Sequence, residues 1–501
     1  MGGAVGLALV LAVVARFLTV SHLWLDEALT VNIARLPLGD LFRALRHDGA
    51  PPLYYLLLHV WMDMAGTGDV AARALSGLLG VASLPLMWLA GRRLAGERGQ
   101  PGARWVAWAG VLLLASSPFA IRYATETRMY SLVIVLVLAG FLALDTVLHR
   151  RSVGASVGLG VVTGLLLLTH YWAFFLVGAV AILLALQWRR MEGARRALLA
   201  MAVGSLLFVP WLPSFLEQMR NTGTPWGTPP KPRTVFDIVL QFAGGLPDTA
   251  LPLGLLLYAL LALGLFGAAV GAGIVTLDLR GRPPGRRVAA AAGLTMAFAV
   301  AVGQITGSAF AIRYAAVVFP LVILLAALGS ATLAGNWAGP VVLGLAVTLG
   351  FATAIPNAAG DRTSAGRVAA ALRAEARPGD VVAYCPDQLG PAVSRVLAAG
   401  GAPKVAQVTF PRGTGPEFVD WVGYEEANRA TATAPFAAML LQRAGPEHTV
   451  WVVWAPGYRT FGTKCQGLLA DLRQARPLER RVVKVPTNTF ERPGLVRYRP
   501  N

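Results

Sequence analysis

Two adjacent carboxylates follow the first apolar run of the chain. Asp26 and Glu27 lie in "SHLWLDEALTV", in a sequence of 501 residues of which only 14% are charged. A carboxylate at the mouth of a helical bundle can act as a general base or help to hold a divalent cation. The same pair also suits the first turn of a helix, where acidic side chains interact favourably with the helix dipole. The spacing alone leaves these two interpretations evenly matched.

A second acidic residue lies in a short stretch between two apolar runs. Glu126 is flanked by Arg122 and Arg128 in "RYATETRMYSL". A turn of a few residues needs no cluster of charges for solubility, and charged residues this close to a membrane are often functional. The alternative is an arginine that reaches the interface and forms a salt bridge with Glu126.

Two histidines have the chemistry of ligands or acid–base partners. His47 precedes Asp48 in "LRHDGAPPLYY", although the segment 49–52 also has the composition of a turn. His170 lies in "LLLLTHYWAFFL", where it could bind a metal or a substrate hydroxyl. The aromatic residues that follow it are typical of an interfacial belt, so His170 alone is weak evidence for a site.

One arginine near the start of a late apolar run has the chemistry of a phosphate ligand. Arg313 and Tyr314 occur in "SAFAIRYAAVVFP". A guanidinium group can hold a phosphate through paired hydrogen bonds. The acidic, histidine and arginine residues together favour chemistry at one membrane surface over an ion pathway, which would require charges within the spans.

The composition is that of a polytopic membrane protein. Apolar residues make up 55% of the chain, and the mean hydropathy is +0.58. The net charge of +18 would suggest nucleic-acid binding in a soluble protein, but many of the basic residues occupy short loops between apolar runs. We therefore expect a membrane protein that binds no nucleic acid.

Apolar runs of roughly 20 residues predict about eleven membrane-spanning helices. The first run contains Arg16 and lacks a clear cleavage site, so we interpret it as a retained helix rather than a signal peptide. The expected spans are 3–20, 71–91, 105–122, 129–148, 154–169, 171–188, 197–215, 250–275, 287–308, 315–334 and 338–355.

Arginine clusters predict the orientation of these spans. With a cytoplasmic N-terminus, every cluster falls on the inner side; the clusters comprise Arg92, Arg93, Arg98, Arg104, Arg150, Arg151, Arg189, Arg190, Arg195, Arg196, Arg280, Arg282, Arg286 and Arg287. The run 51–66 is short for a crossing, so we interpret it as an interfacial or re-entrant helix on the outer side. The outer side then receives 21–70, 123–128, the surroundings of His170, 216–249, 309–314 and the tail.

The tail has the pattern of a soluble α/β domain. From Asp361 onward the apolar runs shorten to strand length, as in "DVVAYC" and "TVWVVWAP", and alternate with helix-like segments. We expect a transmembrane domain over 1–355 and an extracytoplasmic α/β domain over 356–501. Cys385 and Cys465 do not form a metal-binding motif, and an extracytoplasmic location would allow a disulfide between them.

An ordered set of motifs resembles bacterial integral-membrane glycosyltransferases of the GT-C superfamily. The motifs are "LWLDEALTV", "HDGAPPLYYLLLHVW", "YATETRMYSL", "THYWAFFLV", "PWLPSFLEQM" and "RYAAVVFPLVILL", within residues 1–355. The chain is similar to the family-39-like or mannosyltransferase group, which includes relatives of the protein O-mannosyltransferases and the lipid A aminoarabinose transferase. The tail matches none of these motifs.

The resemblance implies a GT-C fold and transfer of a sugar, with inversion, from a polyprenyl-phosphate donor to an acceptor on the outer side of the bacterial plasma membrane. It implies that Asp26 is the general base and that Glu27 and Glu126 are further catalytic carboxylates. Substrate contacts are expected from His47, Asp48, Tyr54, Arg128, Tyr130, His170, Tyr171, Arg313 and Tyr314. A divalent cation, Mg²⁺ or Mn²⁺, near Glu27 or His170 stays an expectation, because metal dependence varies within the superfamily.

Two other functions fit the same composition. A transporter or flippase for a lipid-linked glycan would use the outer charges as a gate, but it predicts more polar, broken spans than the sequence contains. A non-catalytic envelope assembly protein would tolerate replacement of Asp26. The sequence favours mannose only through the resemblance, and it leaves open whether the acceptor is a glycan, a lipid or a protein.

Overall fold

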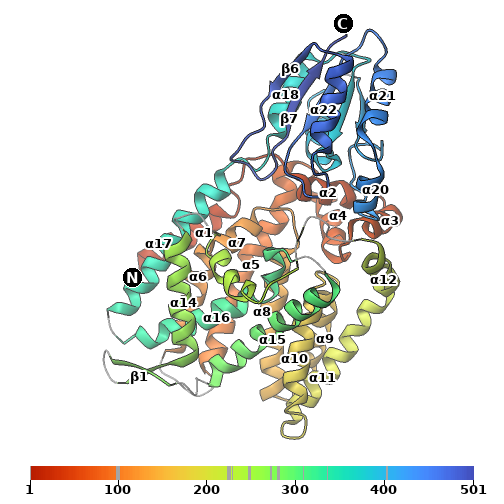
Figure 1. Ribbon diagram of the computed structural model, residues 1–501. Helices are drawn as coiled ribbons and strands as arrows, with labels where there is room; N and C mark the ends of the chain where they lie inside the picture. The colour runs from red at the N-terminus through yellow and green to blue at the C-terminus, as the bar shows by residue number, and fades with distance from the viewer. Residues whose placement is uncertain are drawn as a thin grey trace.

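The computed structural model describes residues 2–96, 102–222, 227, 229–245, 250–270, 274–278, 283–307, 310–335, 337–401 and 404–500. A bundle of apolar helices forms one layer, and a mixed α/β unit lies on one end of it (Figure 1). Arg98, Arg280, Arg282 and parts of the expected outer loops 216–249 and 309–314 lie outside the described residues.

Many helices of the bundle are long and apolar enough to cross a membrane. In the described ranges these are α5 (Asp69–Gly96), α8 (Tyr130–His149), α15 (Pro283–Thr306), α17 (Ala338–Ala359) and the continuous run of α11 (Glu192–Ser205), η1 (Leu206–Trp211) and α12 (Leu212–Asn221). A bent pair, α6 (Ala103–Ser116) and α7 (Pro118–Ala124), passes the same test. Shorter apolar helices are α1 (Gly2–Ala15), α9 (Val153–Leu167), α10 (Ala173–Ala185), α14 (Ala250–Phe266) and α16 with η3 (Phe319–Ser330 and Ala331–Leu333). Each expected span has its counterpart among these helices, so the chain is a multi-pass membrane protein.

One expected span is shorter than its apolar run. The sequence predicts a helix over 250–275, but α14 ends at Phe266, and β1 (Gly267–Val270) pairs antiparallel with β2 (Ile274–Leu277). Glycines lower helix propensity by about 1 kcal/mol each, and β-branched residues such as those in "IVT" favour strands.

The segments expected outside gather at the end of the bundle that carries the α/β unit (Figure 1). They include α2 (Leu25–Ala34), α3 (Leu38–Asp48) and α4 (Leu53–Ala65), followed later by α13 (Thr234–Phe242) and η2 (Ile312–Val317). The 13 residues of α4 include His59 and Asp63, so this helix is less apolar than α10, which has the same length and belongs to the apolar helices of the bundle. Basic residues expected inside pair with acidic residues on neighbouring helices at the other end, as Arg93 does with Asp145 at 3.3 Å.

The bend between α6 and α7 brings a polar turn to the outer end of the bundle. The two helices meet at 58°, where the Ser117 hydroxyl accepts a hydrogen bond from the Ala120 amide and Pro118 opens α7. Proline suits the first turn of a helix because it has no amide hydrogen to leave unpaired. Phe119 then packs on Phe242 and Phe319, with ring centroids 4.8 Å apart in both pairs. This apolar contact anchors α7 and, with it, the charged turn that follows.

The C-terminal unit contains a five-stranded sheet of order β4-β3-β5-β7-β6. Strands β3 (Val381–Cys385), β4 (Ala406–Thr409) and β5 (Val450–Trp454) are parallel, while β7 (Gly494–Tyr498) is antiparallel to both β5 and β6 (Glu479–Val483). The flanking helices are α18 (Ala365–Glu375), η4 (Asp387–Leu389), α19 (Gly390–Ala399), α20 (Tyr424–Ala430), α21 (Thr433–Ala444) and α22 (Lys464–Ala475).

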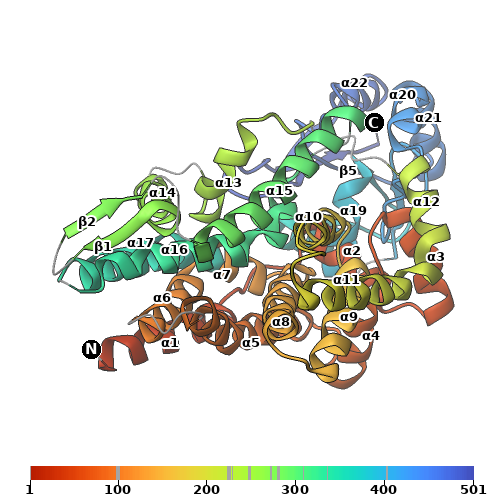
Figure 2. The same cartoon turned by 90° about the horizontal axis from the view of Figure 1, so that it is seen from below.

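The chain beyond β4 approaches the first outer loop. The Trp421 amide donates to the His47 carbonyl at 3.1 Å, and the Gly423 amide donates to the Asn221 carbonyl at 3.1 Å. Figure 2 shows α19 and α20 on the same side of the bundle as α2 and α3. The carboxyl ends of the parallel strands therefore face the membrane helices.

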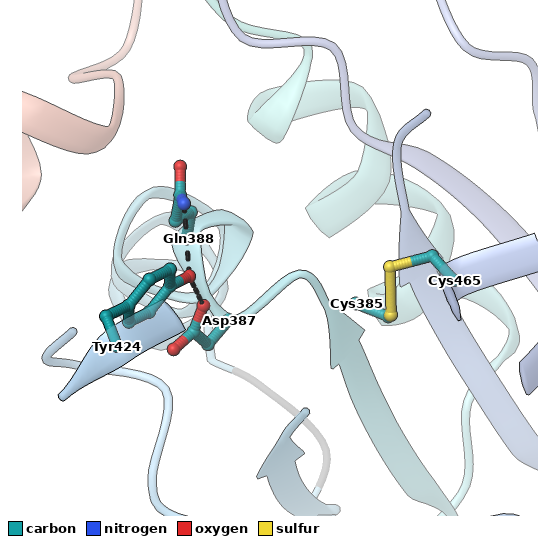
Figure 3. The surroundings of a disulfide bond; sticks show 5 residues. All are labelled: Cys385, Asp387, Gln388, Tyr424 and Cys465. Carbon is teal, nitrogen blue, oxygen red and sulfur yellow. Dashed lines mark hydrogen bonds between the residues drawn. A yellow bond between two sulfur atoms is a disulfide. The ribbon is translucent and has the colours of Figure 1, made fainter. Parts of the chain in front are cut away.

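A disulfide joins the end of β3 to the start of α22. Cys385 and Cys465 are bonded, with Cα atoms 5.5 Å apart at a sequence separation of 80, which confirms that the two residues are close enough to pair. A buried polar group lies beside the bond, in which Tyr424 donates to the Asp387 carboxylate and Gln388 donates to Tyr424 (Figure 3). Burial raises the pKa of Asp387 to about 7.

Replacing both cysteines with serine should destabilise the C-terminal unit. A native disulfide that closes a loop of this length contributes about 2–4 kcal/mol, largely by restricting the unfolded chain. We expect a lower melting temperature for the Cys385→Ser/Cys465→Ser variant, measured by thermal unfolding of the purified protein. Reductant should shift the wild type toward the variant and leave the variant unchanged; equal melting temperatures without reductant would contradict this prediction.

Candidate active site

The two adjacent carboxylates of α2 point in different directions. Successive side chains on an α-helix diverge by about 100°, so they can face separate surroundings. The Asp26 side chain is 18% exposed and faces Arg313, whereas the Glu27 side chain is 0% exposed and faces Arg73. The pair thus divides into an accessible carboxylate and a buried one.

Both oxygens of Glu27 are engaged. Arg73 lies in the first turns of α5. Its Nε donates a hydrogen bond to Oε1 of Glu27 at 2.7 Å, and a terminal nitrogen donates one to Oε2 at 2.6 Å. The Thr127 amide also donates to Oε1, at 3.0 Å. This bidentate pair positions α2 against α5 and against the turn after α7. The geometry indicates a positioning role for Glu27, and the catalytic or metal-binding role expected from the sequence stays a prediction.

Replacing Glu27 with glutamine should reduce stability. The change leaves Arg73 buried without its counter-charge, and breaking a buried pair in this way costs roughly 3–5 kcal/mol. We expect a clear drop in melting temperature, which the double variant Glu27→Gln/Arg73→Met partly restores, because it removes the uncompensated charge. A variant with wild-type stability and lost turnover would instead assign Glu27 to the chemistry.

The turn after α7 carries two charged residues, Glu126 and Arg128, and only Arg128 lies beside Asp26. Glu126 is buried, and its Oε1 accepts a hydrogen bond from Arg122 Nε at 3.1 Å. A terminal nitrogen of Arg362 lies 3.8 Å from the same oxygen. Arg128 points the other way, donating to the Thr30 hydroxyl at 2.9 Å and to the Asp26 carbonyl at 3.5 Å. Glu126 therefore supports the turn through ion pairs, and Arg128 faces the site.

Asp26, Arg128 and Arg313 form the charged centre of the site. A terminal nitrogen of Arg313 lies 3.4 Å from Asp26 Oδ2, and the Arg313 side chain is 25% exposed. Arg128 contacts the backbone of Asp26 from the other side. These residues come from α2, the turn before α8, and η2. Two guanidinium groups beside one accessible carboxylate can bind a phosphate while the carboxylate accepts a proton.

Aromatic rings line the side of this centre toward α9 and α10. The His170 ring lies 5.7 Å from Tyr130 and 5.5 Å from Tyr314, and Trp172 lies 5.7 Å from Tyr314, between ring centroids. The Tyr130 hydroxyl is buried and has no hydrogen-bond partner among the described residues. Tyr130, His170 and Tyr314, which the sequence proposes as substrate contacts, thus lie together beside Arg313, and their contact with substrate stays a prediction.

His170 is a neutral hydrogen-bond donor. Burial lowers its pKa to about 3, and the charges of Arg128 and Arg313 act in the same direction. Its Nδ1 accepts the Trp172 amide at 3.1 Å, so the ring proton lies on Nε2. A protonated Nε2 and an occupied Nδ1 leave no lone pair for a metal.

The donor set does not fit the expected divalent cation. Glu27 uses its oxygens on Arg73 and Thr127, and His170 lacks a free lone pair. Among the described residues no group of three or more histidine, cysteine, aspartate or glutamate side chains is placed to hold a metal. We therefore assign no step to a cation at Glu27 or His170.

Asp48 and Tyr55 extend the site toward the first outer loop. The Tyr55 hydroxyl donates to Asp48 Oδ2 at 2.6 Å. Burial raises the pKa of Asp48, and the nearby Arg128 opposes this shift. The hydroxyl of Tyr54, which was expected to contact substrate, is hydrogen-bonded to Ser76 at 2.7 Å. Asp48 and Tyr54 both lie near enough to Arg128 for its charge to act on them.

Two other expected substrate contacts point elsewhere. His47 bonds Asp420 of the C-terminal unit, with Nδ1 2.8 Å from Oδ1. Tyr171 donates to Gln218 on α12 and accepts from Trp211 at 3.0 Å. Both residues join the outer elements to one another, and their expected contact with substrate stays a prediction.

Sequence reasoning missed several residues that complete the site. Arg73 and Arg362 hold Glu27 and the Glu126 turn. Tyr458 of the C-terminal unit is also close: burial raises the pKa of its phenol, and the charges of Glu491 and Asp26 contribute to the increase. Arg73 could have been predicted as a partner of an acidic residue, because it lies near the outer start of an apolar span, where a buried charge needs a counter-charge.

Comparisons with known proteins bear on this arrangement. The family model described as dolichyl-phosphate-mannose-protein mannosyltransferase matches residues 49–213. The structure of ArnT from Cupriavidus metallidurans in the apo state aligns over 99% of this chain and 98% of its own, at 15% identity and a TM-score of 0.63. The chain has the GT-C fold. The fold expected from the sequence motifs is thereby confirmed.

Two further structures share this GT-C fold. ArnT from the same organism bound to undecaprenyl phosphate aligns over 99% of this chain and 98% of its own, at 16% identity and a TM-score of 0.59. The oligosaccharyltransferase of Archaeoglobus fulgidus in complex with Zn and sulfate aligns over 90% of this chain and 67% of its own, at 11% identity and a TM-score of 0.53. No curated protein sequence matches the chain.

Proposed function

We propose that the protein transfers a sugar from a polyprenyl-phosphate donor to a hydroxyl group of a cell-envelope acceptor. The observation that carries this proposal is the accessible carboxylate of Asp26, 3.4 Å from Arg313 and in contact with Arg128 through its backbone. The reaction needs a base for the acceptor and positive charge for the phosphate, and the carboxylate of Asp26 and the two guanidinium groups supply them in one place. The acceptor hydroxyl must lose a proton, and the departing phosphate gains charge.

The reaction is a single displacement at the anomeric carbon. The Asp26 carboxylate takes the acceptor proton as the acceptor oxygen bonds to that carbon. The bond from the carbon to the phosphate oxygen breaks, and the electron pair leaves on the phosphate, beside Arg128 and Arg313. Attack from the face opposite the phosphate inverts the anomeric configuration. The Nε2 hydrogen of His170 and the Tyr130 hydroxyl are suited to hydrogen-bond the donor.

The comparisons support the donor class and a first choice of sugar. The matching family is described by dolichyl-phosphate mannose, and one structural neighbour holds undecaprenyl phosphate. A polyprenyl-phosphate sugar is therefore the donor class, with mannose as the first candidate. We place the site on the outer face of a bacterial plasma membrane, with the C-terminal unit outside, because the arginine-rich loops lie at the opposite end of the bundle.

The test is sugar transfer by purified protein in nanodiscs. Polyprenyl phosphates carrying mannose, arabinofuranose, galactose or glucose are supplied with an acceptor-rich envelope extract, with and without EDTA. We expect turnover of one donor, with mannose tested first. No release from any donor would contradict the proposal and favour a flippase or an assembly protein. Loss of turnover with EDTA would require a cation site other than Glu27 and His170.

A further inference from the structure

Arg362 lies at the junction between the membrane helices and the C-terminal unit. It stands between α17 and α18, and its side chain is 0% exposed. Its guanidinium group donates to the Thr125 carbonyl at 2.7 Å and to the Thr125 hydroxyl at 2.5 Å. It also donates to the Thr19 hydroxyl at 3.4 Å and lies 3.8 Å from Glu126. The buried guanidinium group of Arg362 thus joins the segment at Thr19, which leads to α2, to the segment at Thr125, which leads to Arg128.

The backbone around Arg362 is fixed from both sides. The Arg362 amide donates to the Ser21 hydroxyl at 2.9 Å, and the Arg362 carbonyl accepts from the Glu491 amide at 3.0 Å. The Thr363 hydroxyl donates to the Glu491 carboxylate at 2.5 Å. The C-terminal unit therefore determines where the Arg362 side chain is held.

The turn that Arg362 holds leads directly to the reacting groups. Two residues after Thr125, the Thr127 amide donates to Glu27 at 3.0 Å. One residue later, Arg128 contacts Thr30 and the Asp26 carbonyl. A movement of Thr125 therefore displaces Arg128 relative to Asp26. In a site of this kind, a displacement of about 1 Å can reduce the rate roughly 100-fold.

We propose that Arg362 is a positioning residue for sugar transfer, through which the C-terminal unit sets the geometry of Arg128 and Asp26. This inference rests on the proposed function of the site. It gives the C-terminal unit a part in the reaction that the motifs of residues 1–355 do not record. The side chain makes two hydrogen bonds to Thr125 and one to Thr19. The planar guanidinium group of arginine presents several N–H donors in a fixed arrangement, so these contacts favour arginine over lysine.

The experiment compares three variants of the full-length protein in nanodiscs. Arg362→Met removes the contacts, and Arg362→Lys keeps one charge and part of the hydrogen bonding. Arg476→Met is the matched control: Arg476 is also buried, but it donates to the carbonyls of His448 and Gly445 within the C-terminal unit. Transfer kinetics and hydrogen exchange at the amides of Thr127 and Arg128 are measured below the melting temperature of every variant.

We expect kcat/KM for the donor to fall roughly 100-fold in Arg362→Met, with partial recovery in Arg362→Lys and no change per folded molecule in Arg476→Met. Exchange at Thr127 and Arg128 should be faster in Arg362→Met than in Arg476→Met. Equal kinetics in the two methionine variants would overturn the proposal. If the wild type transfers no sugar, the proposed function fails, and unchanged exchange in Arg362→Met would separately refute the positioning role.

Discussion

Asp26→Asn should lose most of its turnover while binding the donor as well as the wild type does. Asparagine has nearly the same shape as aspartate but cannot accept the acceptor proton. General-base catalysis contributes about 10²–10⁴-fold, and we expect a decrease in kcat of that size. The KM for the donor should stay the same or fall, because the substitution removes a negative charge beside the site of the donor phosphate.

The matched control for this variant is Asp40→Asn. Asp40 occupies the first turn of α3, as Asp26 occupies the first turn of α2, so both substitutions remove an acidic group from a helix N-terminus. Asp40 is half-exposed, and among the described residues its side chain pairs with the nearby Arg43. Turnover should be unchanged in Asp40→Asn. Similar turnover in both asparagine variants would show that Asp26 is not the base.

Arg313→Gln should be the second most damaging substitution. Arg313 lies 3.4 Å from Asp26, where it can stabilise the charge that develops on the departing phosphate. Removing one such donor typically lowers kcat by about 10²–10³-fold. Arg313→Lys should fall between the wild type and Arg313→Gln, since lysine keeps the charge without the paired hydrogen bonds.

An arginine on the same side of the bundle provides the control. Arg46 is half-exposed and lies 3.9 Å from Glu217, on α12. Arg46→Gln should therefore retain wild-type kinetics with the same donor, because screened surface pairs of this kind contribute little. Equal kinetics for Arg313→Gln and Arg46→Gln would exclude a role for Arg313 at the phosphate.

The sequence predicted the arrangement of spans because both signals that determine it are local. Apolar length places each helix, and arginines in short loops give its direction. Asp26, Arg128 and Arg313 could be predicted to converge, since all three fall at outer helix ends. The same reasoning extended α14 too far, because a run of small residues is apolar without being helical.

Three residues expected at the site form other contacts, and one physical cause explains this. Glu27, His47 and Tyr171 have the chemistry of site residues, but each is engaged by a partner distant in the sequence. The partners are Arg73, Asp420 and Gln218 respectively. A sequence reveals which groups are ionisable or polar, whereas long-range pairing decides which of them remain accessible. The contacts of Arg362 could not be predicted from the sequence for the same reason, because they join segments more than 230 residues apart.

The anomeric configuration of the product depends on both the proposed transfer and the position of Asp26, because it requires turnover and reports the geometry of attack. The measurement is the one-bond carbon–hydrogen coupling at the anomeric centre, by NMR, of the product made by the wild-type protein from a donor of known configuration. We expect inversion, with the acceptor oxygen activated by Asp26 opposite the phosphate. A product that retains the donor's configuration would contradict it, because retention requires a second displacement for which Asp26 would serve as a nucleophile.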